Sequence, residues 1–250
     1  MSLARLRAFV RLRRARLRGW LALFRMLLAA LRGRVDEIWV GDSHSVTFNT
    51  AQPPLPGILR TAERRWTWHL GPRVMYSIAR DDFPPTLLRT ARLVARVPGA
   101  RDAAWFFSFG EIDIRCHLAP RLAQGADADF VATYVERVRG LVGRLGTRTG
   151  TIVVPVPPCL DSYDHAAFPV AGSPEERLVA HGAVRTALTA AVDATPGLRL
   201  LDVTEALAGP DGLMRDELTD DGCHTNAAGR AAVRHEVSVL LRATLPRPRG

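Results

Sequence analysis

The sequence contains no lysine, so all 34 of its basic residues are arginine. It also has only three cysteines, Cys116, Cys159 and Cys223, which stand far apart along the chain. Three scattered thiols are too few for a disulfide framework or for a metal site built on paired cysteines, and an odd number suits a reducing compartment. No uninterrupted apolar run reaches the ~20 residues that a helix needs to cross a bilayer. These absences exclude a disulfide-rich secreted domain and an integral membrane protein, and we expect a cytoplasmic location.

The positive charge is confined to one end of the chain. The formal net charge is +9, yet residues 1–34 hold ten arginines and no acidic residue. The remainder therefore has 34 − 10 = 24 arginines against 25 acids, a net charge of −1. No zinc-finger, RNA-recognition or KH signature accompanies the basic segment. We expect no nucleic-acid partner, and the 47% apolar and 24% charged content is typical of a globular protein.

Residues 1–34 are predicted to form a basic amphipathic helix. Apolar residues recur there at roughly helical spacing, at Leu3, Leu6, Val10, Leu17, Leu21, Phe24, Leu28 and Leu31. The most apolar part, residues 20–31, is interrupted by Arg25, and no small-residue cleavage site follows it. Three placements stay open: packing against its own domain or a partner chain, peripheral contact with an anionic membrane surface, and export.

Residues 35–245 are predicted to form one α/β domain, because short apolar runs alternate with longer amphipathic stretches. The predicted strands are 36–41, 73–79, 103–110, 151–157 and 198–203, and the predicted helices are 85–97, 128–146, 174–194 and 226–244. This alternation indicates a mostly parallel five-stranded sheet covered by helices on both faces. Ligands of such sheets bind beyond the carboxyl ends of the strands.

A serine, a histidine and an aspartate stand at those predicted strand ends. Ser43 follows the first strand within GDSHS, and Asp221 and His224 lie in DGCH just before the last helix. A serine hydroxyl becomes a nucleophile when a base takes its proton, and that base needs a third group to fix its tautomer. An aspartate three residues before a histidine can reach the imidazole within one tight loop, which Gly222 makes easier. The three residues are therefore predicted to form a catalytic triad.

The order of these motifs resembles that of the SGNH/GDSL hydrolase superfamily. Four segments are similar to its blocks I, II, III and V: GDSHS (41–45), the glycine of HLGPR (Gly71), GEID (110–113) and DGCHTNAAG (221–229). The resemblance covers roughly residues 36–241. It implies a flavodoxin-like three-layer α/β/α sandwich that hydrolyses esters or thioesters.

The resemblance also implies roles for single residues. Ser43, Asp221 and His224 match the triad, and the backbone N–H groups of Ser43 and Gly71 match the oxyanion hole. Block III of the family reads GxND, and its asparagine side chain donates to the oxyanion; here that position is Ile112. Losing one such donor costs about 100- to 1000-fold in rate. Either another group substitutes, or the chemistry is weaker or altered.

Polar residues beside the motifs are expected to bind substrate. They are Asp42, His44, Glu111, Asp113, Arg115 and His117. Arg115 suits an anionic group such as a carboxylate. The segment FGEIDIRCH (109–117) resembles a block III variant of SGNH-like proteins associated with bacterial polysaccharide and secondary-metabolite genes.

Structural and chemical alternatives exist for each motif. Ser43 suits a helix N-cap, and Asp221 with His224 suits an Asx-turn before a helix. Arg115 suits an ion pair with a neighbouring carboxylate. Asp42 with His44 also opens the metallophosphoesterase pattern, whose later motifs are missing from the sequence. A glycosidase pair of Glu111 and Asp113 is a further alternative.

Three functions follow from these motifs. The first is an esterase or deacylase that acts on an acylated sugar or metabolite, a small-molecule or glycan ester. The second is an O-acyltransferase that uses the same triad. The third is a catalytically impaired domain that binds a glycan or anionic ligand and is held to a membrane by residues 1–34. None of the three requires a cofactor or a metal.

Overall fold

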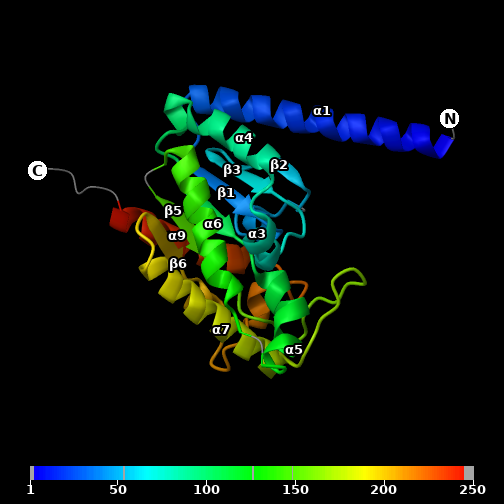
Figure 1. Cartoon of the computed structure of the whole chain (residues 1–250), viewed down its shortest axis with the longest axis vertical. Coiled ribbons are helices and arrows are strands. Elements are labelled where there is room, and N and C mark those ends of the chain that lie inside the picture. Colours follow the sequence, from blue (N-terminus) through cyan, green and yellow to red (C-terminus); the bar gives the residue numbers. More distant parts are fainter. Residues whose placement is uncertain (1–2, 53, 126, 148, 245–250) are drawn as a thin grey trace, which may run out of the picture.

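The computed structural model describes the backbone of residues 3–244 except 53, 126 and 148, and the side chains of residues 17–243 with the same exceptions. Six strands form one sheet in the order β2-β3-β1-β4-β5-β6 (Figure 1). The strands are β1 (Glu37–Gly41), β2 (Gly57–Ala62), β3 (Arg65–His69), β4 (Ala104–Ser108), β5 (Gly150–Val153) and β6 (Leu198–Leu201). All neighbours are parallel except β2 and β3. The five parallel strands have the flavodoxin-like order, which confirms the predicted fold class.

Helices cover both faces of the sheet. The longer ones are α1 (Leu3–Leu31), α3 (Met75–Asp81), α4 (Pro85–Ala95), α6 (Phe130–Leu145), α7 (Pro174–Asp193) and α9 (Ala227–Thr244). The shorter elements are α2 (His44–Thr47), η1 (Pro98–Ala100), the π-helical turn η2 (Asp113–Leu118), α5 (Ala119–Leu122), α8 (Thr204–Leu207) and η3 (Asp216–Leu218). Figure 1 shows α4 and α6 in front of the sheet, with α1 across one end of it.

The alternation of side chains along β1 separates two apolar clusters. Ile38 and Val40 point into the larger cluster, which α1, α3, α4, α6 and α7 complete. Trp39 points to the opposite face, where it stacks on Phe106 at a centroid distance of 4.4 Å and meets the apolar side of α9. Because successive strand residues point to opposite faces, one fully buried strand supplies both cores.

The sequence prediction was wrong in two places, at α3 and at the hairpin of β2 and β3. Residues 73–79 were predicted as a strand, but Met75–Asp81 is the helix α3. The Asp113 carboxylate accepts the N–H groups of Met75 and Tyr76, at 2.6 and 3.1 Å, and thereby caps the start of this helix. A cap supplied from 38 positions away leaves no local signal in the sequence. The β2–β3 hairpin was missed because its Glu63-Arg64 turn lacks the Gly or Asn typical of tight hairpins. With these two strands, the sheet has six strands instead of the predicted five.

The second half of α1 belongs to the core of the domain. Leu23, Met26 and Ala30 are buried in the same cluster as Ile38 and Val40. The end of α1 lies against η1, where a Cβ on Gly99 would lie 2.0 Å from the Ala30 carbonyl oxygen. Within the described residues, no helix combines the length and apolar character needed to cross a membrane.

Candidate active site

Ser43 lies directly after β1, where α2 begins. Its backbone is helical (φ −59°, ψ −31°), and its hydroxyl makes no capping hydrogen bond to α2. Asp42 supplies that cap instead, because its Oδ1 accepts the N–H of His44 at 3.0 Å. The Ser43 Oγ lies 2.8 Å from Nε2 of His224. Ser43 therefore stands at the N-cap position of α2, but its side chain does not cap the helix.

His224 and Asp221 lie in the loop between η3 and α9. The Nδ1 of His224 is 2.7 Å from Oδ2 of Asp221. The other oxygen, Oδ1, accepts the backbone N–H groups of Cys223 and His224 at 2.9 and 2.7 Å. Burial alone raises the pKa of the Asp221 carboxyl, but the hydrogen bonds from the His224 ring and backbone outweigh it and hold the pKa well below its ordinary value. Asp221 is therefore an Asx-turn acceptor and an ionised partner of the imidazole at once.

Gly222 allows this loop to lie against its neighbour. Its φ is +69°, and a Cβ at this position would lie 1.9 Å from the carbonyl oxygen of Asp161. The Gly222 carbonyl also accepts the N–H of Tyr163 at 3.1 Å. The close approach of the two backbones requires glycine here.

Asp42 and His44 are buried beneath the triad. The ring centroid of His44 is 5.2 Å from that of His224. Burial, followed by the nearby His224 and Arg115, lowers the pKa of His44 well below its ordinary value, so the ring is neutral. Burial and the neighbouring Glu111 raise the pKa of Asp42 well above its ordinary value. Both groups therefore favour their uncharged forms.

Arg115 joins the segment after β4 to the loop 159–172. Its Nε donates to Oε1 of Glu111, one helical turn earlier. Its Nη1 donates to the backbone carbonyls of Tyr163 and Phe168, at 2.7 and 3.1 Å. Arg177 holds the same loop by donating to three more of its backbone carbonyls, those of Cys159, Leu160 and Gly172. The Arg115 guanidinium is thus already bound by groups of the protein itself. This agrees with the alternative in which Arg115 forms an ion pair with a neighbouring carboxylate.

A cavity of about 270 Å³ opens beside Ser43 and His224. Of the residues predicted to bind substrate, Glu111 and Arg115 line it, together with Ile112. Asp42, His44 and Asp113 are buried behind the site. His117 lines a separate cavity of about 450 Å³ with Tyr76, Arg121 and Phe130.

Several lining residues were not singled out from the sequence. They are Pro54, Pro56, His69, Pro72, Tyr163, His165 and Phe168. The ring of Tyr163 stacks on that of His165, which in turn stacks on Phe168. The loop that carries these three rings has no periodic pattern or motif, so the sequence offers no local signal for their role.

Gly71 follows β3 at the same edge of the sheet. It is buried, with φ +75°, and the preceding Leu70 donates its N–H to the carbonyl of Gly41. The side chain of Ile112, which the sequence resemblance matches to an asparagine, has no hydrogen-bond donor.

Three potential metal ligands meet beneath the cavity. The ligand atoms of His44, Cys223 and His224 all lie within 4.8 Å of one another, and the Cys223 Sγ is 3.8 Å from the His44 Nε2. The His224 Nε2 already faces the Ser43 hydroxyl. A metal ion here would displace that contact, so metal binding and a serine nucleophile are mutually exclusive at this site.

Comparison with known proteins identifies the fold. No protein-family model and no curated protein matches the sequence. A carbohydrate esterase of family 3 from Talaromyces cellulolyticus superposes with a TM-score of 0.52 at 15% identity, over 84% of this chain and 97% of that chain. A GDSL-like lipase from Bacteroides thetaiotaomicron gives 0.50 at 9% identity, over 86% and 91%. A Streptococcus pneumoniae protein, provisionally described as a platelet activating factor, gives 0.53 at 14% identity, over 93% and 98%. Similarity at this level of identity establishes a shared fold.

Proposed function

We propose that this chain, which has the fold of the SGNH/GDSL hydrolases, is a serine ester hydrolase with Ser43 as nucleophile, His224 as base and Asp221 as the orienting acid. One observation carries the proposal. An unbroken chain of hydrogen bonds runs from the Ser43 Oγ through both ring nitrogens of His224 to the Asp221 carboxylate, with distances of 2.8 and 2.7 Å. This is the geometry that serine hydrolases need before substrate arrives.

The reaction follows from the direction of these bonds. The Ser43 Oγ attacks the ester carbonyl carbon while its proton passes to the His224 Nε2. The tetrahedral intermediate collapses, its bond to the alcohol oxygen breaks, and His224 protonates the leaving alcohol. Water then attacks the acyl-serine, His224 takes the water proton and returns it to Ser43, and the carboxylic acid leaves. Asp221 keeps the Nδ1 protonated and stabilises the imidazolium that forms twice in the cycle.

The developing oxyanion would be held by the backbone N–H groups of Ser43 and Gly71. These groups belong to two loops that leave neighbouring parallel strands at the same edge of the sheet. With Ile112 in place of a side-chain donor, we expect a turnover lower than that of a three-donor site by about 100- to 1000-fold.

The shape of the cavity supports a small ester substrate. Its volume of about 270 Å³ is at or below the lower end of ordinary ligand sites, which suits a short acyl group. The partly exposed Tyr163 ring at its wall offers a flat surface for a sugar or a similar alcohol moiety. We therefore favour a short acyl ester of a sugar or another polar metabolite as substrate.

The decisive experiment is covalent labelling with a fluorophosphonate probe followed by peptide mapping. We expect one labelled peptide, modified at Ser43. Ser43→Ala should abolish both the labelling and the turnover of p-nitrophenyl acetate, the latter by on the order of a million-fold. Asp221→Asn should lower the turnover by roughly 10⁴-fold, because the wrong imidazole tautomer then faces Ser43.

A matched control is Ser238→Ala on α9. Its hydroxyl donates to the Arg234 carbonyl one turn earlier in the same helix, remote from the cavity. This variant should retain full labelling and turnover. A well-folded protein that is neither labelled nor active would refute the proposal and favour a binding domain that has lost its catalysis.

A further inference from the structure

Helix α1 presents a second apolar face that nothing in the described structure covers. Leu23, Met26 and Ala30 face the core, as described above. Large apolar side chains also lie on the outward side, at the helical spacing i, i+3, i+4, i+7 and i+14: Leu17, Trp20, Leu21, Phe24 and Leu31. All five are between 49% and 68% exposed. A helix that is apolar on two opposite sides buries one against its domain and offers the other to a partner.

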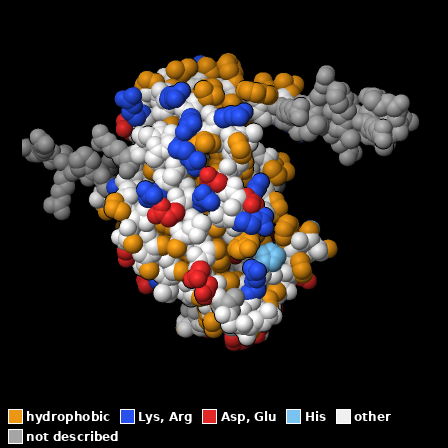
Figure 2. Space-filling model, in the orientation of Figure 1, with side chains coloured by type: hydrophobic (Ala, Val, Ile, Leu, Met, Phe, Trp, Pro, Cys, Tyr) orange, Lys and Arg blue, Asp and Glu red, His pale blue; other side chains and the backbone are white. Residues whose placement is uncertain are grey.

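The outward stripe stands out on the surface of the molecule. In Figure 2 hydrophobic side chains gather along the top edge, where α1 runs, with arginine side chains just below them. Figure 1 shows α1 continuing well beyond the body of the domain. The stripe lies on the half of α1 that packs against the domain, along the outer edge of the molecule.

A row of arginines borders this stripe on one side. Arg18, Arg25 and Arg32 are spaced seven residues apart, so they lie on one edge of the helix, and all three are exposed. Among the described residues, none of the three has a carboxylate within ion-pair distance. Two of them, Arg25 and Arg32, also line a cavity of about 520 Å³ between α1 and the β2–β3 hairpin.

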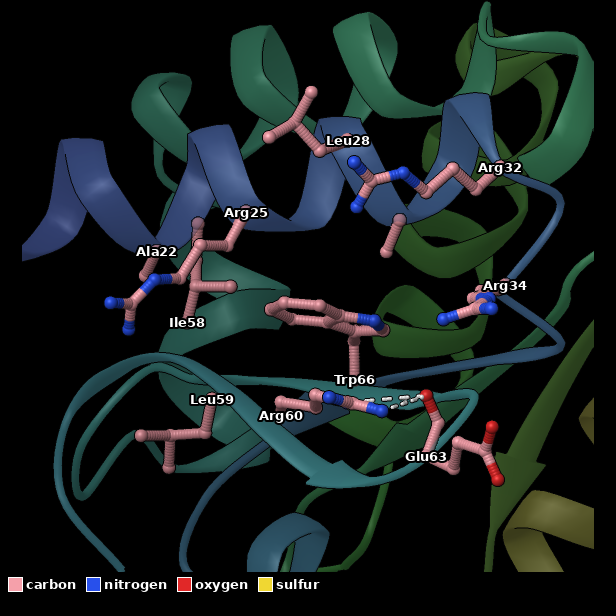
Figure 3. Close-up of a pocket in the computed structure, with 11 residues that line it drawn as sticks. Ala22, Arg25, Leu28, Arg32, Arg34, Ile58, Leu59, Arg60, Glu63 and Trp66 are labelled. Atoms are coloured by element: carbon pink, nitrogen blue, oxygen red, sulfur yellow. Dashed lines mark hydrogen bonds between the residues drawn. The ribbon is translucent and has the colours of Figure 1, made fainter.

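Figure 3 shows the interior of this cavity. The guanidinium groups of Arg25, Arg32, Arg34 and Arg60 surround the indole of Trp66. The Arg60 guanidinium is held by the Glu63 backbone carbonyl at 2.8 Å, while Arg34 is exposed at the rim. An apolar floor ringed by cations is suited to an amphiphile with an anionic head group.

The positive charge of residues 1–34 indicates which partner the apolar stripe of α1 binds. Residues 1–34 hold ten arginines and no acidic residue, so a second copy of α1 would bring ten like charges against the first. An anionic lipid surface supplies both the apolar layer and the negative charge that such a helix matches. We propose that α1 docks the protein on an anionic membrane surface, with its outward stripe in the acyl–headgroup boundary and the bordering arginines on lipid phosphates.

This orientation turns the candidate active site away from the bilayer. The end of α1 lies beside η1 and leads into β1, at the amino ends of the strands, whereas Ser43 follows the carboxyl end of β1. Membrane contact would then fix the position of the protein without covering the cavity. The inference is thus independent of the catalytic proposal.

Trp20 provides a direct probe of the docking face. The chain has five tryptophans, and the other four, Trp39, Trp66, Trp68 and Trp105, are at most 5% exposed. We would add the full-length protein to vesicles of phosphatidylcholine alone or mixed equally with phosphatidylglycerol, and record its fluorescence. The mixed vesicles should shift the emission to the blue, and brominated lipids should quench it. Both effects should disappear in Trp20→Phe, which should still sediment with the vesicles.

Two sets of variants separate the apolar and ionic parts of the surface. Trp20→Ser with Phe24→Ser should weaken sedimentation with the mixed vesicles by at least roughly ten-fold. Each of Arg18→Gln, Arg25→Gln and Arg32→Gln should weaken it by roughly five-fold. The matched controls are Val179→Ser and Val239→Ser, exposed apolar residues on α7 and α9, and Arg139→Gln on α6; they should bind as the native protein does.

Three outcomes would overturn the inference. One is the absence of sedimentation and of any change in Trp20 emission with mixed vesicles. Another is equal binding to neutral vesicles, since the arginines would then have no role. The third is a concentration-dependent blue shift without lipid, together with a dimer in analytical ultracentrifugation, which would make a second copy the occupant.

Discussion

Two aspartates near the candidate site are driven in opposite directions by their surroundings. Asp221 is partly exposed, and hydrogen bonds from the His224 ring and two backbone N–H groups lower its pKa. Asp113 is 3% exposed, and burial raises its pKa to about 6, although the N–H groups of Tyr76 and Met75 oppose the rise. The same side chain therefore serves as an ionised partner in one loop and as a proton-binding helix cap in the other.

Asp113 should make the stability of the protein depend on pH. Its pKa is about 6 in the folded state and 3.8 ordinarily, so the folded state binds the proton more tightly. The resulting stabilisation is complete below about pH 4 and is lost as the pH rises through about 6. We expect the free energy of unfolding of the native protein, minus that of Asp113→Asn, to fall by about 2 to 3 kcal/mol between about pH 4 and about pH 7.

Urea unfolding of the two proteins across this pH range tests the point. Taking the difference removes the other titrating groups, including the nearby Asp42, to the extent that the substitution leaves them unchanged. A difference that stays constant, or grows with pH, would mean that Asp113 is ionised in the folded protein at acidic pH.

At the scale of secondary structure elements, the buried Glu37 on β1 links this strand to β3 and α9. Its carboxylate accepts from Arg65 on β3 at 2.9 Å and from both terminal nitrogens of Arg234 on α9 at 2.7 Å. Burial raises the pKa of Glu37, but Arg234 and Arg65 outweigh it and the pKa is lowered. Because β1 leads to Ser43 and α9 follows His224, this cluster fixes the two elements next to the proposed nucleophile and base.

Removal of Glu37 should therefore be costly. Glu37→Ala leaves two partly buried arginines without a carboxylate partner, and of the two only Arg234 keeps a hydrogen bond within the described structure, to the Asn49 Oδ1 at 3.3 Å. We expect a loss of about 3 to 5 kcal/mol in the free energy of unfolding. Glu136→Ala breaks an exposed pair with Arg139 and should change it by less than about 1 kcal/mol. Denaturant titration of both variants makes the comparison, and similar small losses would show that the Glu37 cluster contributes little.

Elements can be predicted from the sequence when their structure depends on residues close together along the chain. The strands at 36–41, 103–110, 151–157 and 198–203 and the four long helices could be predicted from periodicity and were found with small shifts in their ends. Helix α3 could not, because the Asp113 carboxylate that caps it comes from another loop. The loop 159–172 could not either, since Arg115 and Arg177 fix it through contacts that the fold brings together. The motifs at Ser43, Asp221 and His224 predicted which residues meet, whereas the rings that line the cavity had no such signal.

At the scale of the whole molecule, α1 serves the fold and the surface at once. Met26 lies in the strongly basic segment, whose composition differs from that of the rest of the chain. Its side chain is nevertheless fully buried in the main core. The described second half of α1 and the sheet thus share one apolar cluster, and loss of the helix would expose part of the core.

Substitutions on the buried and on the exposed side of α1 should affect the free energy of unfolding differently. Met26→Ala should lower the free energy of unfolding by about 2 to 5 kcal/mol, because it leaves a cavity in the core. Leu31→Ala, at a side chain that is 68% exposed, should change it by less than about 0.5 kcal/mol. Thermal and urea unfolding measure both effects, and equal stabilities would mean that α1 does not belong to the folded unit.

The hydrogen bonds from Arg115 and Arg177 to main-chain carbonyls have a consequence for how the proposed specificity of this cavity could change over time. Every hydrogen bond described between these arginines and the loop 159–172 ends on a peptide oxygen, which any amino acid provides. These hydrogen bonds are therefore insensitive to which side chains the loop carries. If the proposed function holds, new preferences for an alcohol or acyl group could arise by exchanging Tyr163, His165 or Phe168 alone, while Ser43, His224 and Asp221 stay where they are.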